Sequence, residues 1–499
     1  MKTIAEAVAH NAAIQPTGIA FIEACTGEAL SWRDYNERAQ SFVPRLCTVQ
    51  RGTRLALQID RGIDMHIAML ACELAGIVGV GIGARAGASE VTHLTLTTDA
   101  MAIVTTLDEL AEIGIADTPA PGPVRRDTDA VSGSRPFDDL ELWFLNSTSG
   151  TTGLPKCVMH HQRRWFAFHE LAQRAGQLTS ADVFMSLLPA PFGFGLWTAH
   201  FTPTILGAPC VILDKFNAAI AADAIAKFAV SVMAAVSTQF VMMLNDVTLR
   251  SVNSTSMRVL FTGGEMVPPT RAQEWEQLTG SRVLQFYGSN ETGALSNTNL
   301  LDEESVRLFS AGHIITDLNV RLFDPETGAD VTATGGPGIA ACRGEVNCLG
   351  YFNDLAANQE LFTADGWMRT GDLCTIDDAG VLTVAGRASD FIIRGGKNIS
   401  AAVIEQACSS MRGVTLAAAV AKPDATFGER VCVFCVITKT AASFSLDDLR
   451  HHLHDAGVGK EYWPEYLVIH TEDLPRSSGG KVAKSDLRRV ANALPPLRH

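Results

Sequence analysis

Apolar segments of two kinds alternate along the chain. Residues 54–59 and 258–264 are short and apolar, as in buried strands, and each precedes a longer run, 64–76 or 269–280, with helical spacing of apolar residues. Strands that alternate with helices in this way are typical of α/β proteins with largely parallel sheets. The pattern therefore predicts an α/β fold.

Helix ends are marked by local signals. Ser31 with Asp34 and Ser445 with Asp448 match the capping-box pattern, and Gly457 is suited to end the second helix. Residues 1–13 lack the apolar core and cleavage site of a signal peptide and are better suited to a short amphipathic helix.

The longest apolar run, residues 67–84, contains Glu73 and several glycines, which favours a buried helix-to-strand passage over a membrane span. We therefore expect no integral membrane contact. The 11 cysteines are scattered and no secretory signal is present, which indicates reduced thiols and a cytoplasmic protein. Cys432 and Cys435 form a C-x-x-C inside an apolar run without a second pair, so buried thiols are favoured over a metal or redox site.

Length and composition bound the domain count and the partners. A chain of 499 residues exceeds one ordinary hydrophobic core, so at least two domains are expected. Residues 118–139 are rich in Pro, Gly, Asp and Ser, as in a surface connection, and we place a domain boundary within 386–400. The net charge of -14 argues against nucleic acid or an anionic membrane as the main partner, because both bind clustered Lys and Arg.

Residues 146–158, "NSTSGTTGLPKCV", combine hydroxyl side chains, glycines and a lysine, as in phosphate-binding loops. They do not match the Walker A pattern, because Leu154 and Pro155 separate the last glycine from Lys156 and Cys157 follows it. The runs 142–148 and 156–161 on either side are strand-like. We therefore expect a loop between two strands that binds phosphate through hydroxyls, backbone N–H groups and Lys156.

Further motifs follow in order: "FTGGEMVPP" from Phe261, "QFYGSNETG" from Gln285, "DGWMRTGDL" from Asp365, "GRASDFIIRGGKNIS" from Gly386 and "PRSSGGKVAK" from Pro475. With the phosphate-type loop, this series resembles the motif set of the adenylate-forming superfamily, which includes acyl-CoA synthetases, peptide-synthetase adenylation domains and firefly-luciferase-type enzymes. The resemblance spans residues 4–487. It implies a large N-terminal domain of layered β-sheets and helices (1–387), a hinge (388–390) and a small mobile α+β C-terminal domain (391–499).

The resemblance also implies a reaction. A carboxylic acid attacks the α-phosphorus of ATP to give an acyl-adenylate and pyrophosphate, and the thiol of CoA then displaces AMP. Carboxylate and triphosphate repel one another, so the site must neutralise charge and align the reactants. The implied cofactors are ATP, Mg²⁺ and CoA, and the implied partner is a small-molecule carboxylic acid.

Carried over position by position, the resemblance gives each motif residue a role. The residues implied to hold the β- and γ-phosphates are Thr148, Ser149, Thr151, Thr152 and Lys156. Those implied to lie against adenine or flank the nucleotide are Gly263, Gly264, Glu265, Tyr287, Gly288 and Asn290. Glu291 would ligate magnesium, Asp372 would bind the ribose hydroxyls, and Arg387 would reach ribose or phosphate, with a simple interdomain salt bridge as its alternative. Lys481 would join the substrate carboxylate to the α-phosphate.

The small domain is implied to alternate between two orientations, one for each half-reaction. In the first it delivers Lys481, and in the second it presents residues 394–400 to build a thioester channel. The family's hinge position is occupied by Ser389, with Asp390 next to it, and either residue is accepted as the pivot.

Several positions depart from the family pattern. Asn290 replaces a Thr, Cys157 and Gly479 replace a Gly and a Ser, and Gln162 stands where a His often follows the phosphate loop. None of these changes removes a charge that adenylation needs. Together they favour a relative with altered or narrowed substrate use over a generic fatty-acid ligase.

The acid pocket is expected around residues 189–200, "PAPFGFGLWTAH", where Phe192 occupies the place of a family His. Phe194 and Trp197 would add aromatic walls suited to a flat or cyclic apolar acid, with core packing as the alternative for these two residues. Thr238, within 236–240, would line the other side. The C-terminal "GKEYWPEYL" resembles ligases for medium-chain and alicyclic acids.

The sequence thus favours an AMP-forming acid–CoA ligase for a small aromatic, alicyclic or medium-chain acid. One alternative keeps adenylation but changes the chemistry around it: the acceptor is a carrier-protein thiol or an amine, or nitrite is activated as in diazotases. A non-catalytic nucleotide-binding protein is a third. The oligomeric state is left open, with a homodimer among the alternatives.

Overall fold

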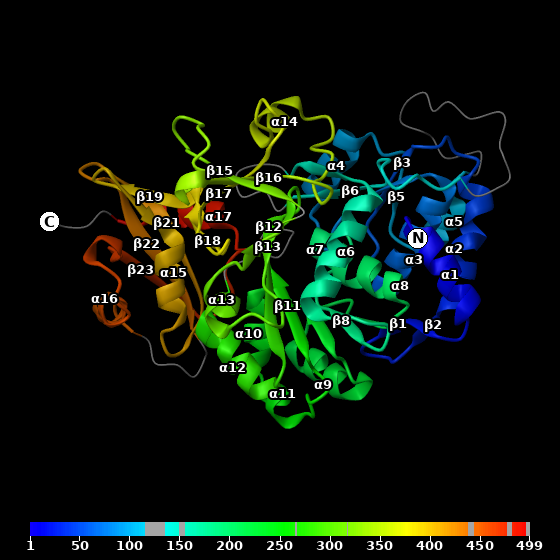
Figure 1. The fold of residues 1–499 in the computed structure, drawn as a ribbon, viewed down its shortest axis with the longest axis horizontal. Coiled ribbons are helices and arrows are strands. Elements are labelled where there is room, and N and C mark those ends of the chain that lie inside the picture. Colours follow the sequence, from blue (N-terminus) through cyan, green and yellow to red (C-terminus); the bar gives the residue numbers. More distant parts are fainter. Residues whose placement is uncertain are drawn as a thin grey trace.

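The computed structural model describes residues 1–114, 135–148, 155–264, 267–316, 318–437, 444–476 and 482–495, apart from the side chain of Ser389. The described part contains four sheets. Three belong to the large N-terminal part and one to the smaller C-terminal part, which lies at the left of Figure 1 in orange and red.

The largest sheet has nine strands in the order β14-β13-β12-β11-β10-β8-β9-β1-β2. The strands from β1 to β12 along this path pair in parallel, and hairpin partners β2, β13 and β14 add antiparallel edges. Their bounds are β1 (Ile19–Glu23), β2 (Ala29–Ser31), β8 (Phe184–Ser186), β9 (Cys210–Ile212), β10 (Val232–Ala234), β11 (Val259–Gly263), β12 (Arg282–Ser289), β13 (Gly293–Asn297) and β14 (His313–Ile314).

A five-stranded sheet, in the order β5-β3-β4-β6-β7, lies beside it and shares one buried apolar cluster with it. Its strands are β3 (Arg54–Leu57), β4 (Val78–Gly81), β5 (Ile103–Val104), β6 (Phe144–Ser147) and β7 (Cys157–His160). The helices of this part are α1 (Ile4–Ile14), α2 (Trp32–Leu46), α3 (Gly62–Ala75), α4 (Ala88–Thr98), α5 (Leu107–Glu112), α6 (Gln162–Gly176), α7 (Gly193–Gly195), the π-helical η1 (Leu196–Phe201), α8 (Thr202–Leu206), α9 (Ala218–Phe228), α10 (Ser237–Asn245), α11 (Val247–Ser251), α12 (Pro269–Thr279) and α13 (Glu304–Phe309).

An antiparallel four-stranded sheet, β15-β16-β17-β18, completes the large part. Its elements are β15 (Asn319–Phe323), η2 (Thr332–Thr334), β16 (Gly338–Arg343), α14 (Leu355–Leu361), β17 (Met368–Ile376) and β18 (Leu382–Arg387). The turn η3 (Ala388–Asp390) then leads into the last sheet.

The C-terminal part is built on β19 (Phe391–Arg394), β20 (Lys397–Ser400), β21 (Val414–Asp424), β22 (Gly428–Ile437) and β23 (Tyr466–His470), with α15 (Ala401–Ser409), α16 (Leu446–Asp455), η4 (Lys460–Tyr462) and α17 (Lys484–Ala493). Helices α15 and α16 pack on one face of its sheet and α17 packs on the other. Cys435 and Cys432 of β22 lie on opposite faces in these two cores, so both are buried thiols, as expected.

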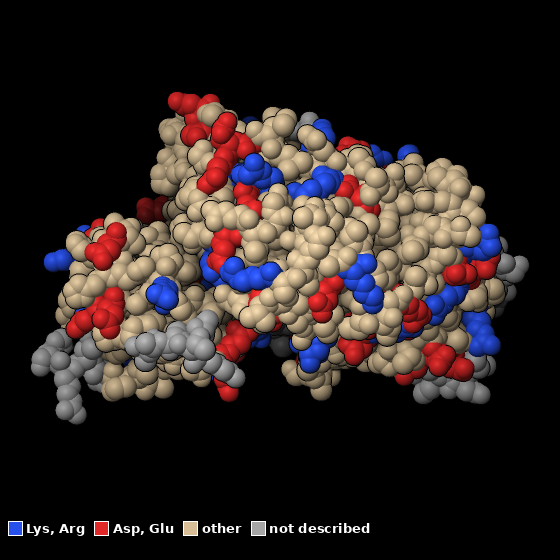
Figure 2. All heavy atoms as spheres, turned by 90° about the horizontal axis from the view of Figure 1, so that it is seen from below, with Lys and Arg blue, Asp and Glu red and all other residues tan. Residues whose placement is uncertain are grey.

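These elements confirm the expected α/β class, with a large layered N-terminal part and a smaller α+β C-terminal part. The mobility of the small part stays a prediction, as do the exact domain bounds. Most of the segment 118–139 lies outside the described residues. On the face shown in Figure 2, acidic side chains gather at the projecting upper-left corner, and elsewhere basic and acidic side chains are interspersed.

The helix signals in the sequence are confirmed. Ser31 caps α2 through the N–H of Asp34, and Ser445 with Asp448 forms a complete capping box on α16. The apolar run from Ile67 is a buried passage from α3 to β4, with Gly76 in the left-handed conformation between them. In the part of the chain that the structure describes, no helix is long and apolar enough to cross a membrane.

Helix α1 is docked by two buried acceptors. The N–H of Ile4 donates to Oε1 of Gln162 (2.7 Å), and the N–H of Ala5 donates to Oε1 of Glu73 (2.9 Å). Both N–H groups lie in the first turn of the helix, where they have no intrahelical acceptor. The departure at Gln162 therefore has a structural reason: this side chain fastens α1 to α6.

Burial raises the pKa of Glu73 to about 7, although the hydrogen bond from the Ala5 N–H favours its charged form. A folded-state pKa above the ordinary value of 4.5 means that folding favours the protonated acid. Its contribution to stability is thus full below pH 4.5 and is lost as the pH rises through 7.

Glu73→Gln, neutral at every pH, is expected to remove about 3 kcal/mol of the difference in unfolding free energy between pH 4.5 and pH 7.5. Urea unfolding at the two pH values measures that difference. Glu37→Gln, at an exposed position of α2, is the control and should keep the wild-type pH dependence. The same pH dependence in Glu73→Gln would show that Glu73 is not the titrating group.

Candidate active site

The ends of the phosphate-type loop are held by a strand pair. β6 and β7 are antiparallel neighbours, as the sequence predicted, with Ser147 opposite Cys157. The N–H of Thr148 donates to the carbonyl of Lys156 (2.9 Å), and the N–H of Lys156 donates to Oγ1 of Thr148 (3.2 Å). Ser149, Thr151 and Thr152 lie outside the described residues. Cys157 is buried, and burial raises the pKa of its thiol to about 12, so it is an unreactive core residue.

Lys156 and Glu291 converge on one side chain that the sequence did not single out. The hydroxyl of Tyr351 donates to Oε1 of Glu291 (2.8 Å), and Nζ of Lys156 lies 5.0 Å from the centre of the Tyr351 ring. Lys156 is partly exposed and also lies 3.9 Å from Oε2 of Glu360. A cation and a carboxylate from two distant motifs thus meet around Tyr351, where phosphate and a divalent cation could be held together.

A second polar group joins the motif residues Tyr287, Asp372 and Arg387. The Tyr287 hydroxyl donates to Oδ2 of Asp372 (2.9 Å), and Nε of Arg387 donates to Oδ1 of the same carboxylate (3.3 Å). Asp372 and Arg387 face each other across β17 and β18, so Arg387 pairs within its own sheet rather than between domains. Burial raises the pKa of Tyr287 well above its usual value, which keeps it a neutral donor.

Glycines allow close backbone approach along the nucleotide motifs. A Cβ at Gly263 would lie 2.5 Å from the carbonyl oxygen of Phe286, and one at Gly288 would lie 1.7 Å from that of Gly293. Gly264 adopts a positive φ of 77°. A side chain at any of these three positions would force the strands apart or strain the backbone. Glu265 lies outside the described residues.

The aromatic residues expected around the acid differ in burial. Phe192 and Phe194 are partly exposed, and Thr238 at the start of α10 is also partly exposed. Trp197 is 1% exposed; its ring stacks on that of Phe194 with centroids 5.2 Å apart and contacts Phe261. Trp197 therefore packs in the core beneath Phe194, and a contact of any of these side chains with an acid stays a prediction.

The hinge region is tied to the last helix. Asp390 accepts from Lys484 (3.2 Å) and from Arg488 (2.9 Å), both on α17, and Lys484 also pairs with Glu405 (2.8 Å). Burial would raise the pKa of Asp390, but these two cations hold it below its usual range. A β-bridge between Arg476 and Val482 closes the segment that contains Lys481, which itself lies outside the described residues, as does Gly479.

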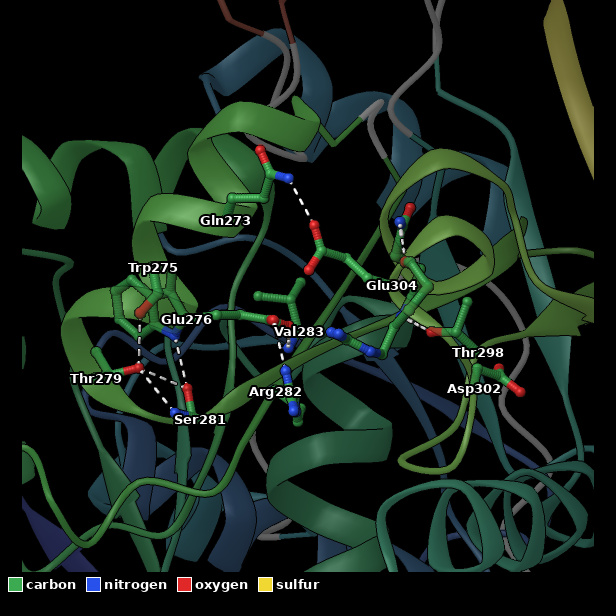
Figure 3. Close-up of polar contacts among 12 residues, drawn as sticks. Gln273, Trp275, Glu276, Thr279, Ser281, Arg282, Val283, Thr298, Asp302 and Glu304 are labelled. Atoms are coloured by element: carbon green, nitrogen blue, oxygen red, sulfur yellow. Dashed lines mark hydrogen bonds and ion pairs between the residues drawn. The ribbon is translucent and has the colours of Figure 1, made fainter.

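The strand that carries Tyr287 is anchored at its start by a buried ion pair (Figure 3). Glu276 of α12 pairs with Arg307 of α13 and with Arg282, and its Oε1 accepts from the N–H of Val283 (2.8 Å). Arg307 is 2% exposed. The sequence offered no signal for this cluster, because its members belong to three elements without a shared motif.

Comparison with known proteins shows which enzymes the chain is similar to. Residues 8–352 match the family described as AMP-binding enzyme. The chain is 31% identical over 354 residues to the medium-chain fatty-acid–CoA ligase of Escherichia coli (strain K12), a match that spans 70% of this chain but only 61% of that ligase. It is 28% identical over 500 residues to the salicylyl-CoA synthase / salicylate adenylyltransferase of a Streptomyces species, covering 92% of this chain and 89% of that protein.

Among solved structures, ATP-bound MatB from Rhodopseudomonas palustris has a TM-score of 0.84 at 25% identity, covering 98% of this chain and 99% of that one. The superfamily resemblance of the motifs is thereby confirmed. The chain belongs to the AMP-binding enzyme family.

Proposed function

We propose that this protein is an AMP-forming acid–CoA ligase. It activates a small aromatic, alicyclic or medium-chain carboxylic acid as an acyl-adenylate, releases pyrophosphate and transfers the acyl group to the thiol of CoA. The observation that carries the proposal is the convergence of Lys156 and Glu291 on Tyr351, since adenylation needs a phosphate-binding cation beside a metal-binding carboxylate. The names of the relatives support the same class of reaction.

Glu291 suits Mg²⁺, because this ion takes one or two carboxylates and completes its octahedron with water and phosphate oxygens. One Glu291 oxygen is oriented by Tyr351, which supports the other as the metal ligand. When bound, Mg²⁺ would neutralise triphosphate charge. The remaining roles follow the motifs: Thr148, Ser149, Thr151, Thr152 and Lys156 for phosphates, Gly263, Gly264, Glu265, Tyr287 and Gly288 for the base, and Asp372 and Arg387 for ribose.

Pyrophosphate release tests the proposal. The protein is incubated with ATP and Mg²⁺ across a panel of aromatic, alicyclic and medium-chain acids, plus nitrite, with CoA present or absent. Acid-dependent release that CoA turns into continuous turnover supports the proposal. If CoA leaves pyrophosphate release unchanged but a carrier protein or an amine accelerates it, that carrier protein or amine is the acceptor in place of CoA. If release depends on nitrite, nitrite is the activated substrate in place of the acid.

Phe192→Ala is expected to change the order of preferred acids and to leave the KM for ATP within about threefold of wild type, because Phe192 would face the acid and not the nucleotide. The panel above, run with both proteins, gives kcat/KM for each acid. Ile14→Ala, at an exposed position more than a hundred residues before the first of these motifs, serves as the control. A selective rise in the KM for ATP would contradict a role in the acid pocket.

Location and assembly follow from this proposal only as predictions. A ligase that uses ATP and CoA is expected in the cytoplasm. If the protein forms a homodimer, its kcat should not depend on protein concentration above the dissociation constant of the dimer.

A further inference from the structure

Arg164 of α6 is a buried cation that contacts no carboxylate within ion-pair distance among the residues described. It is 1% exposed, and its Nε donates to the carbonyl of Val346 (3.0 Å). One terminal nitrogen donates to the carbonyls of Asn290 (3.0 Å) and Glu291 (3.4 Å), and the other lies 2.6 Å from Nδ1 of His160. Burial lowers the pKa of Arg164 to about 10, so it is still charged at neutral pH.

The guanidinium of Arg164 determines which groups donate and which accept in the hydrogen bonds that follow it, through His160 to Asn146. Arg164 can only donate, so Nδ1 of His160 must accept and the proton of this imidazole is on Nε2. Nε2 then donates to Oδ1 of Asn146 (2.7 Å), and the Asn146 amide nitrogen donates to the carbonyl of Pro191 (2.9 Å). Nδ2 of Asn290 donates to the same Oδ1 (2.6 Å), so the Asn290 amide cannot flip without losing this bond.

His160 and Asn146 are as deeply buried as Arg164, at 0% and 1% exposure. Burial, with the charge of Arg164 beside it, lowers the pKa of His160 far below its usual value. The ring therefore stays neutral through the physiological range. The donor directions from Arg164 through His160 to Asn146, and from Asn290 to the same Asn146 oxygen, are thus set by the fold and stay the same through the physiological pH range.

Asn290 lies between the two halves of the candidate active site. It precedes Glu291, it bonds to Asn146 at the end of β6 beside the phosphate-type loop, and a Cβ at Gly193 would lie 2.4 Å from its Oδ1. Gly193 follows Phe192 in the segment expected to bind the acid. Only one of the two Nδ2 hydrogens of Asn290 is used by Asn146, so the second is free to donate to an anion.

We propose that Arg164, His160 and Asn146 are positioning residues that hold the Asn290 amide as a donor to a phosphate oxygen of the nucleotide. The proposal rests on the proposed function and deepens it, because Asn290 occupies a position at which the family pattern has a hydroxyl. A hydroxyl can rotate to point its hydrogen at an acceptor. An amide N–H points at an acceptor only if hydrogen bonds on the other side of the amide hold its plane in place. The hydrogen bonds from Arg164 through His160 fix the Asn146 amide, and Oδ1 of Asn146 in turn fixes the Asn290 amide; we call this arrangement the relay.

Two substitutions at His160 separate orientation from packing. His160→Leu fills the space but can neither accept from Arg164 nor donate to Asn146, whereas His160→Gln can do both. His160→Leu is expected to lower kcat/KM for ATP in acid-dependent ATP–pyrophosphate exchange about 30-fold, and His160→Gln about threefold or less. His169→Leu is the matched control: His169 is a buried histidine on α6, the helix that carries Arg164, and lies 3.4 Å from Oγ1 of Thr202, so its loss should lower Tm without changing the exchange.

A double-mutant cycle with Asn290→Ala tests whether the relay acts through Asn290. In the Asn290→Ala background, His160→Leu should cost no more than about twofold. If His160→Leu is not folded, Asn146→Ala, which removes the acceptor of the Asn290 N–H, enters the same cycle. An equal loss with His160→Gln and His160→Leu, or the same factor in both backgrounds, would overturn the relay.

Measuring nucleotide affinity tests the relay independently of the proposed function. The α,β-methylene analogue of ATP, titrated calorimetrically with Mg²⁺, is expected to bind His160→Leu about tenfold more weakly than wild type, and His160→Gln and His169→Leu as tightly. If the wild type binds the analogue but no acid supports exchange, the proposed function fails while these affinities still decide the relay. Equal affinity in all four proteins would contradict it.

Discussion

Lys481→Ala is expected to slow acyl-adenylate formation about a hundredfold, while thioester formation from a supplied acyl-adenylate continues at close to the wild-type rate. The family motif assigns Lys481 to the first half-reaction only, where its ammonium would offset charge as the carboxylate meets the α-phosphate. Asp390 holds α17, which begins shortly after Lys481, through Lys484 and Arg488. The lysine is therefore expected to move with the small C-terminal part.

The two half-reactions are measured separately, as pyrophosphate exchange and as CoA-dependent release of AMP from synthetic acyl-adenylate. Lys460→Ala, at an exposed lysine of the same part of the chain, is the control and should change neither rate. Equal losses in both half-reactions of Lys481→Ala would remove Lys481 from its assigned role.

Arg307→Leu is expected to lower the free energy of unfolding by about 3–5 kcal/mol, because it leaves the buried Glu276 carboxylate without its main partner. Glu276 also orders the N–H of Val283 at the start of β12, so the loss should reach the strand that carries Tyr287. Denaturant unfolding followed by far-UV circular dichroism measures the change.

The control for that experiment is Arg250→Leu. Arg250 pairs with Glu274 on the same helix as Glu276, but its side chain is 54% exposed, so its loss should cost about 1 kcal/mol or less. A loss in Arg307→Leu no larger than this would mean that the Glu276–Arg307 pair does not hold α12 and α13 to the sheet.

The sequence predicted the parts of the fold that local patterns encode. The capping residues Ser31 and Ser445, the buried passage from Ile67, and the strands on either side of residues 149–154 all depend on neighbours in the chain, and the structure has each of them. The motifs also brought Tyr287, Asp372 and Arg387 into one proposed nucleotide site, and the structure joins these three by hydrogen bonds.

The contacts that depend on tertiary packing could not be predicted from sequence. Tyr351 lies in a stretch without a recognisable pattern, yet it links Lys156 to Glu291. Gln162 looked like a departure from a phosphate motif, and its partner is the first turn of α1, more than a hundred residues away in the chain. Arg164 is one of three arginines in α6, and nothing local indicates that it, and not its neighbour Arg163, lies beneath the Asn290 loop.

The central claim is that a carboxylate oxygen of the acid attacks the α-phosphorus of ATP. It is tested most directly with an acid that carries ¹⁸O in both carboxylate oxygens, incubated with the protein, ATP, Mg²⁺ and CoA. Attack at the α-phosphorus followed by thiol attack at the carbonyl carbon leaves one labelled oxygen on the phosphate of AMP, and mass spectrometry should find one ¹⁸O in each AMP and one in each acyl-CoA. Label in inorganic phosphate with formation of ADP, or AMP without label, would contradict the account.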